Sequence, residues 1–159
     1  MPAAPLADLS SIDLAAEAVS LEQFRKFVLQ RGSFALIDRV PHHDLDGELI
    51  VGIKEVRGDQ WWASDHIPGR PIFPGALMVE ASAQLATYEF LQRRTDIQDR
   101  FIGFAGIDST RFRGVVAPDS DLVILAKPHR LRAPLFNYRC QGFVDGKLVF
   151  ESQVSGTVL

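Results

Sequence analysis

Two ionisable side chains are notable because the residues around them are almost all apolar or small. In residues 65–84, DHIPGRPIFPGALMVEASAQ, His66 precedes three prolines and Glu80 lies in a long run without another charge. Apolar surroundings disfavour a charged carboxylate, so a protonated Glu80 could donate a proton. An imidazole is suited to accept a proton near neutral pH. We therefore interpret His66 and Glu80 as a candidate acid–base pair.

A backbone group could complete this pair. Gly75 stands where we expect a long helix to begin, spanning residues 75–94. The unpaired N–H groups and the positive end of the dipole at a helix N-terminus can polarise a carbonyl oxygen on which negative charge develops. A base, an acid and an oxyanion donor are what β-elimination next to a carbonyl requires. The base removes the α-proton, the N–H stabilises the enolate-like charge and the acid protonates the departing hydroxyl.

The elements that would position these residues predict an α+β fold. Residues 75–94 are apolar nearly all round, which is typical of a buried helix. Ser20 and Gln23 have capping-box spacing and predict a helix over residues 20–32. Strands are expected at residues 34–40, 48–56, 100–116, 121–132, 135–145 and 147–159, with turns at 41–47, Pro118-Asp119 and Asp145-Gly146. Because no βαβ alternation is present, we expect an antiparallel sheet wrapped around one central helix.

The overall composition predicts a single domain. The 159 residues include 47% hydrophobic and 23% charged residues, enough for a core; we expect residues 20–159 to form it and residues 1–19 to be a loose or weakly helical arm. The net charge of -3 disfavours nucleic acid and anionic membranes as partners. Cys140 is the only cysteine, and neither a signal peptide nor a membrane-spanning stretch is recognisable. These features predict a cytoplasmic protein.

The motif around His66 resembles a known signature. It reads His66-x-Pro68-Gly69-x-Pro71-x-x-Pro74-Gly75, followed by Leu77 and Glu80-Ala81-x-Ala83-Gln84. This pattern is similar to the active-site signature of the FabZ-type 3-hydroxyacyl-[acyl-carrier-protein] dehydratases, which have the hot-dog fold. The segments FALIDRV, GIKEV, FAGIDSTRFRGVVAPDSDL and VDGKLVFES also have counterparts in order, so the resemblance covers about residues 21–157.

The resemblance implies a role for each matching position. His66 matches the catalytic base, and Glu80 matches an acid reached across a dimer interface. Gly75 matches the amide that polarises the thioester carbonyl, the Ile72 carbonyl orients the histidine, and Gln84 supports the carboxylate. Substrate-site positions also include Phe73, Pro74 and Trp62. Glu80 stands where the isomerising relatives carry aspartate, which favours plain dehydration. The resemblance further implies a homodimer, which the family can assemble as a trimer of dimers, and chemistry without metal or redox cofactor.

Several positions depart from the family pattern. Asp65 replaces a glycine, Ile67 replaces a phenylalanine, the pair Trp61-Trp62 is shifted, and Leu29-Gln30-Arg31 replaces a PHR stretch. Asp65 could stabilise the protonated form of His66 and weaken it as a base. These departures leave two alternatives open: a thioesterase on the same fold, and a non-catalytic protein that binds acyl carrier protein.

Charge is distributed unevenly along the chain. Residues 93–139 contain nine Lys and Arg residues against five Asp residues. Such an excess could dock an acidic acyl carrier protein, and the hypothetical contacts are Arg111, Arg113, Lys127 and Arg132. Scattered, solvated charges on strand faces are the equally weighted alternative. The run His42-His43-Asp44 is interpreted as a solvated turn and not as a metal site, because three consecutive residues cannot all face one ion well.

Overall fold

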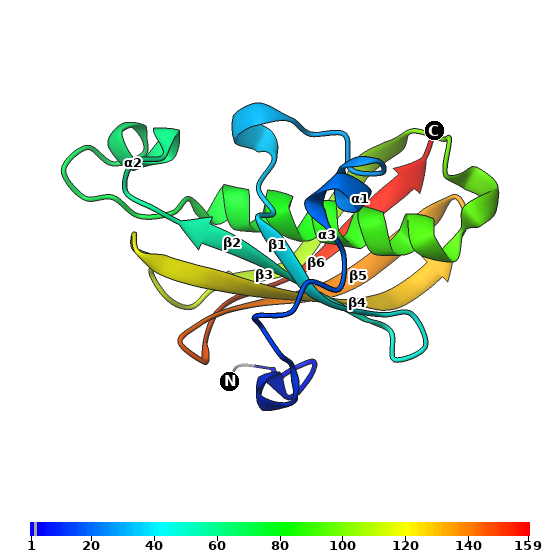
Figure 1. The fold of residues 1–159 in the computed structure, drawn as a ribbon, viewed down its shortest axis with the longest axis horizontal. Coiled ribbons are helices and arrows are strands. Elements are labelled where there is room, and N and C mark those ends of the chain that lie inside the picture. The colour runs from blue at the N-terminus through cyan, green and yellow to red at the C-terminus, as the bar shows by residue number, and fades with distance from the viewer. Residues whose placement is uncertain (2) are drawn as a thin grey trace.

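One long helix, α3 (Gly75–Arg93), lies across one face of a six-stranded antiparallel sheet (Figure 1). The computed structural model describes Met1 and residues 3–159. The sheet order is β1-β2-β4-β5-β6-β3. The strands are β1 (Arg39–Asp44), β2 (Leu49–Val56), β3 (Ile102–Phe112), β4 (Ser120–Arg132), β5 (Leu135–Val144) and β6 (Lys147–Val158). The shorter helices are α1 (Leu21–Arg25), α2 (Trp61–Asp65) and the single 3-10 turns η1 (Leu9–Ser11), η2 (Gly32–Phe34) and η3 (Thr95–Ile97).

The core lies between α3 and the sheet. Alternate strand residues such as Ile50, Ile124 and Phe150 are fully buried and pack in one cluster with Ala81 and Leu85 of α3. This alternation follows from the two-residue period of a strand, which sends every second side chain towards the helix. The arrangement confirms the expected fold class, an antiparallel sheet around one central helix, which is the hot-dog architecture.

Between Ala76 and Thr87, only one stripe of α3 is incompletely buried. Ala76 is exposed and Glu80, Ala83 and Thr87 are partly buried, at spacings of three or four residues that place them on one side of the helix. The positions between them are buried. The helix therefore presents a narrow face of small residues with one carboxylate, and this face is free to line a site.

The N-terminal arm covers the opposite face of the sheet (Figure 1). Side chains of Leu6, Leu9, Ile12 and Leu14 pack against a second apolar cluster. That cluster consists of Leu49, Val51, Ile53, Val123, Leu125 and Phe143. The buried Gln141 fixes the arm, because its amide accepts from Leu6 N at 2.7 Å and donates to Ala4 O at 3.0 Å.

The helix expected over residues 20–32 is much shorter, and that prediction was wrong beyond Arg25. Its start is as predicted, because Ser20 Oγ accepts from Gln23 N at 3.1 Å. The Arg31 guanidinium donates to the carbonyl oxygens of Arg25 and Val28, so that these groups are satisfied without a continuing helix. Gly32 has a φ of +61° and begins η2 instead of capping the helix.

The strand expected at residues 34–40 is displaced to β1, which includes Pro41–Asp44 of the predicted turn. Leu36 N donates to the Gln84 side chain and not to a neighbouring strand, so pairing begins later. The turn is confined to residues 45–48, where Gly47 N donates to Asp44 Oδ1 at 2.9 Å. Helix α2 was not expected. The strands after α3 and the Asp145-Gly146 turn, with φ values of 49° and 74°, are confirmed.

None of the helices among the described residues is long and apolar enough to span a membrane.

Candidate active site

The imidazole of His66 is held in one orientation by the backbone. His66 caps the C-terminus of α2, where its N–H donates to Trp62 O at 2.9 Å. Its Nδ1 lies 2.9 Å from the carbonyl oxygen of Ile72. Because a carbonyl can only accept, this contact favours the tautomer with the proton on Nδ1. The lone pair of Nε2 is therefore available to accept a proton.

Two buried aromatic residues support the loop between His66 and α3. The rings of Trp62 and Phe73 meet edge to face with centroids 5.3 Å apart, and both side chains are buried. Trp62 Nε1 donates to Gln60 Oε1, and Phe73 N donates to Val116 O at 2.8 Å. Both buried residues therefore anchor the loop to the core, whereas Trp61 remains half exposed.

At the N-terminus of α3, no side chain among the described residues compensates the positive end of the helix dipole. Pro74 is the N-cap, no side chain caps the helix and its first turn contains no acidic residue. Gly75 is required here by a close approach, because a Cβ at this position would lie 2.7 Å from the ring of Phe112 in β3. The first backbone N–H groups of α3 are therefore suited to bind a negatively charged oxygen.

Glu80 is tied to its helix and to the segment before β1. Gln84 Nε2 donates to Glu80 Oε1 at 3.0 Å and to Phe34 O at 2.7 Å. Gln84 Oε1 accepts from Leu36 N at 3.2 Å. The buried amide of Gln84 thus fixes one oxygen of the carboxylate. Glu80 itself is only partly buried, more accessible than its apolar sequence surroundings indicate.

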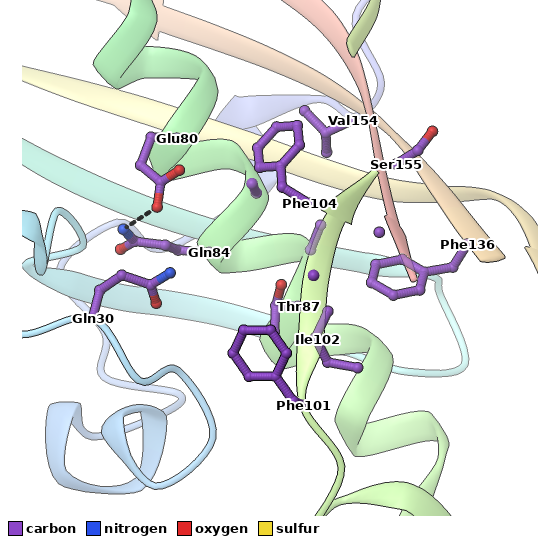
Figure 2. Close-up of a pocket in the computed structure, with 14 residues that line it drawn as sticks. Gln30, Glu80, Gln84, Thr87, Phe101, Ile102, Phe104, Phe136, Val154 and Ser155 are labelled. Atoms are coloured by element: carbon purple, nitrogen blue, oxygen red, sulfur yellow. Dashed lines mark hydrogen bonds between the residues drawn. The ribbon is translucent and has the colours of Figure 1, made fainter. Parts of the chain in front are cut away.

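A pocket of about 200 Å³ opens beside Glu80. Figure 2 shows Glu80, Gln84 and Gln30 on one side of it and the aromatic ring of Phe136 on the other. Between them the wall is formed by small residues of α3, including Ala83 and Thr87, and by apolar residues around the start of β3, including Ile102 and Phe104. The carboxylate and the two amides therefore lie at one end of the pocket, while the rest of its wall is mostly apolar and also contains Thr87 and Ser155. Gln30 was noted in the sequence only as a departure from the PHR pattern, and its place in the pocket was missed.

The single chain does not bring His66 and Glu80 into one pocket. Among the described residues, His66 does not line the pocket that contains Glu80. The sequence suggests that Asp65 could stabilise the protonated form of His66. In the part of the chain described, Asp65 accepts a hydrogen bond from Ser64 Oγ at 2.8 Å and forms none with His66.

A second carboxylate on α3, Glu89, is fully buried and was not recognised in the sequence. Arg93 Nε donates to Glu89 Oε1 at 2.6 Å, the Tyr138 hydroxyl donates to Glu89 Oε2, and Arg93 also donates to Leu45 O. Burial is the main cause that raises the pKa of Tyr138, and the charge of Glu89 is the second. The hydrogen bond to Glu89 raises the pKa of Arg93. Tyr138 lies 49 positions after Glu89, so no local sequence pattern could reveal the cluster of Glu89, Arg93 and Tyr138.

The four cations proposed to contact a carrier protein have different environments. Arg113 forms two hydrogen bonds of 3.1 Å with Glu151, so its charge is largely compensated. Arg111 donates to Thr110 O. Lys127 lies opposite Arg139 across the β4–β5 ladder. Arg132 lines an open cavity of about 420 Å³ together with His129 and Arg130.

The described residues contain no group of three or more His, Cys, Asp or Glu side chains that could hold a metal ion. His43 packs edge to face on Tyr88, and Asp44 is the last residue of β1, where its Oδ1 accepts from Gly47 N. Cys140 is a buried free thiol, and burial raises its pKa to about 12.

The family of FabA-like domains matches residues 29–153. The chain belongs to this family. Its curated relatives include the 3-hydroxyacyl-[acyl-carrier-protein] dehydratase FabZ of Brucella melitensis biotype 2, which is 36% identical over 144 residues, or 89% of this FabA-like chain and 90% of the relative. The corresponding dehydratase of Syntrophobacter fumaroxidans is 34% identical over 83% of this chain and 88% of the relative. The suspected family resemblance is therefore confirmed.

Other matches of the FabA-like chain extend the comparison. The bifunctional enzyme LpxC/FabZ of Chlorobaculum tepidum is 37% identical over 129 residues, but the chain spans only 27% of that enzyme's length. Among solved structures, a dehydratase heterocomplex from Xenorhabdus doucetiae matches with a TM-score of 0.71 at 13% identity, covering 86% of this chain and 90% of that one. A mutant thioesterase from Pseudomonas aeruginosa matches with a TM-score of 0.66 at 14% identity, covering 90% and 96%. At these identities the structural matches establish the fold alone.

Proposed function

We propose that this FabA-like protein dehydrates 3-hydroxyacyl thioesters on acyl carrier protein to trans-2-enoyl thioesters, as part of fatty acid biosynthesis. The names of its curated relatives at 34–36% identity support this activity. The observation that carries the proposal is the contact between His66 Nδ1 and Ile72 O, because it leaves Nε2 as a free base. The proposal places the enzyme in the cytoplasm.

The mechanism uses three groups. His66 Nε2 removes the α-proton of the substrate, and the N–H of Gly75 stabilises the negative charge that develops on the thioester oxygen. Glu80, held by Gln84, donates a proton to the departing hydroxyl, which leaves as water. The electron pair of the broken C–H bond forms the new double bond. No step needs a metal or a redox cofactor.

A second copy of the chain would unite the two halves of the site. Strand β3 is an edge of the sheet, and its side chains Phe104, Ile107 and Phe112 are each about half exposed. Long apolar edge strands are ready sites for pairing with another chain. We propose a homodimer in which Glu80 serves the His66 of the partner, because the single chain leaves these residues apart.

The first experiment is hydration of a crotonyl thioester, followed as loss of absorbance, in the wild type, His66→Ala and Glu80→Gln. We expect both variants to lose at least about 100-fold in kcat, because each lacks one partner in general acid–base catalysis. Mixing the two inactive variants and allowing subunit exchange should restore part of the activity, because one site of each mixed dimer would contain both an intact His66 and an intact Glu80.

The outcomes separate the alternatives. Failure of the mixed variants to regain activity, with exchange verified, would contradict the shared site. Release of free acid would identify a thioesterase. Absence of wild-type turnover with any acyl chain would indicate a protein that only binds the acyl carrier.

A further inference from the structure

One buried aromatic side chain forms the wall of the pocket that faces Glu80. Phe136 of β5 is buried and lies across the pocket from Glu80 (Figure 2). Along α3, the pocket runs from Glu80 past Ala83 to Thr87. Phe90, which packs on Phe136, lies ten residues after Glu80, or about 15 Å along the helix axis. The depth of the pocket is therefore limited by this pair of rings.

The ring of Phe136 is fixed on several sides. It stacks on Phe90 with centroids 3.9 Å apart and planes at 16°, and it meets Tyr138 edge to face at 5.9 Å. It also lies directly over Gly156 of β6, where a Cβ would come within 2.2 Å of the ring. Close packing of this kind leaves little room for another rotamer. Phe136 is therefore a rigid wall and not a movable gate.

The volume of the pocket sets the length of chain that it can hold. An apolar cavity of 150 Å³ can hold the six carbons of benzene, or about 25 Å³ per carbon. On this scale, the pocket of about 200 Å³ accommodates about eight carbons. Ile102, Phe104 and Val154 line the pocket together with the polar Thr87 and Ser155, and the apolar side chains suit an alkyl chain. The polar end beside Glu80 suits the reacting carbons.

We propose that Phe136 is the end wall of the acyl channel and restricts this enzyme to short and medium acyl chains of about eight carbons. This inference rests on the proposed dehydratase function. Each methylene that fits before the wall adds buried apolar surface, worth about 4-fold in affinity. A longer chain meets a ring that cannot turn away, so the gain stops and steric conflict begins.

The test compares kcat/KM for hydration of crotonyl, octenoyl, dodecenoyl and hexadecenoyl thioesters of acyl carrier protein. We expect octenoyl to exceed crotonyl by at least about 10-fold and hexadecenoyl to fall at least about 10-fold below octenoyl. In Phe136→Leu, which removes about three carbons of side chain, the dodecenoyl to octenoyl ratio should rise at least about 10-fold. In Thr87→Leu, which narrows the channel, the same ratio and the octenoyl to crotonyl ratio should fall.

The matched control is Phe150→Leu, which removes the same bulk from the same core cluster but does not line the pocket. Its chain-length ratios should stay within about 2-fold of the wild type. Equal turnover of octenoyl and hexadecenoyl by the wild type, or unchanged ratios in Phe136→Leu, would overturn the end wall while leaving the dehydratase intact.

Binding measurements test the end wall independently of enzyme turnover. Calorimetry with saturated butanoyl, octanoyl and hexadecanoyl pantetheine should show tightest binding for octanoyl. If no substrate is hydrated but this order holds, the proposed function fails and the wall stands. If affinity keeps rising to hexadecanoyl, the wall is refuted.

Discussion

Gln84 Nε2 donates to Glu80 Oε1 at 3.0 Å, one turn back along α3, while the same amide also bonds Phe34 O and Leu36 N. One buried side chain thus orients the proposed acid and fastens the segment that precedes β1. The two functions of Gln84 make separate predictions for activity and stability.

Gln84→Leu should lower kcat by about 10-fold or more, because Glu80 loses the donor that orients it. The free energy of unfolding should fall by about 1–3 kcal/mol, because Phe34 O and Leu36 N are left without this partner. Gln92→Leu is the matched control on the same helix, since Gln92 Nε2 has no hydrogen-bond partner among the described residues. Hydration kinetics and urea unfolding check both effects; a Gln84→Leu protein with wild-type kcat would refute the support of Glu80.

Glu89→Ala should destabilise the fold by about 3–5 kcal/mol, because the partly buried Arg93 and the buried Tyr138 would lose their shared partner. Tyr138→Phe should cost about 1–3 kcal/mol, since Glu89 retains Arg93. Asp96→Asn breaks the exposed pair with Arg94 and should change stability little. Denaturant unfolding measures all three, and equal effects of Glu89→Ala and Asp96→Asn would argue against a structural role for the buried cluster.

The free energy of unfolding should decrease as the pH falls below about 6.5, the ordinary pKa of histidine. Burial lowers the pKa of His43 below its ordinary value of 6.5. Between the lowered pKa of His43 in the folded chain and its ordinary value in the unfolded chain, the unfolded chain binds a proton that the folded chain does not. The free energy of unfolding therefore falls as the pH drops through this window. His43→Gln should flatten the profile there. The carboxylate of Glu151, whose pKa is lowered by the hydrogen bond from Arg113, contributes only below its ordinary value of 4.5. An unchanged slope in His43→Gln would refute this assignment.

Deleting residues 3–14 should lower the free energy of unfolding by about 2–4 kcal/mol, because the partly buried apolar side chains of the arm no longer cover the outer sheet face. Exposure of Val51 and Leu125 should also promote association, which light scattering detects. Asp8→Ala alters the exposed cap of η1 without touching the sheet and serves as the control. A truncated protein that is as stable and as monodisperse as the full chain would contradict this role.

Charge reversal at Lys127 and Arg132 should raise KM for a substrate on acyl carrier protein and leave KM for a small surrogate thioester unchanged. The reason is that these strand cations would meet the acidic carrier and not the acyl chain. The difference should shrink at high salt, which screens exposed charges. Lys26→Glu, at the C-cap of α1, is the control. A KM for the carrier-bound substrate that is unchanged from the wild type in the double variant would contradict these contacts.

Much of the site could be predicted because its parts are close in sequence. Ile72 lies six positions after His66, Gly75 begins the helix, and Gln84 follows Glu80 by one turn. The spacing of Glu80 and Gln84 has a fixed geometry in a helix, so these residues alone indicate that the two side chains can meet, whereas the role of the Ile72 carbonyl was implied by the family resemblance. The turn at Asp145-Gly146 was predictable for the same reason, since its backbone conformation depends on the two residues themselves.

The tertiary structure decided what local spacing cannot specify. The helix at residue 21 ends early because Arg31 satisfies its carbonyl groups, and the arm is fixed by Gln141, which lies 135 positions from Leu6. Glu89 and Glu80 are both glutamates of α3, yet only Glu89 is bonded by Tyr138, because the register of β5 places Tyr138 beside it. The end of the pocket likewise depends on Phe136 meeting Phe90. Sequence determined the chemistry of neighbouring groups, whereas burial and the length of the pocket depend on contacts between distant residues that exist only after the sheet has wrapped around α3.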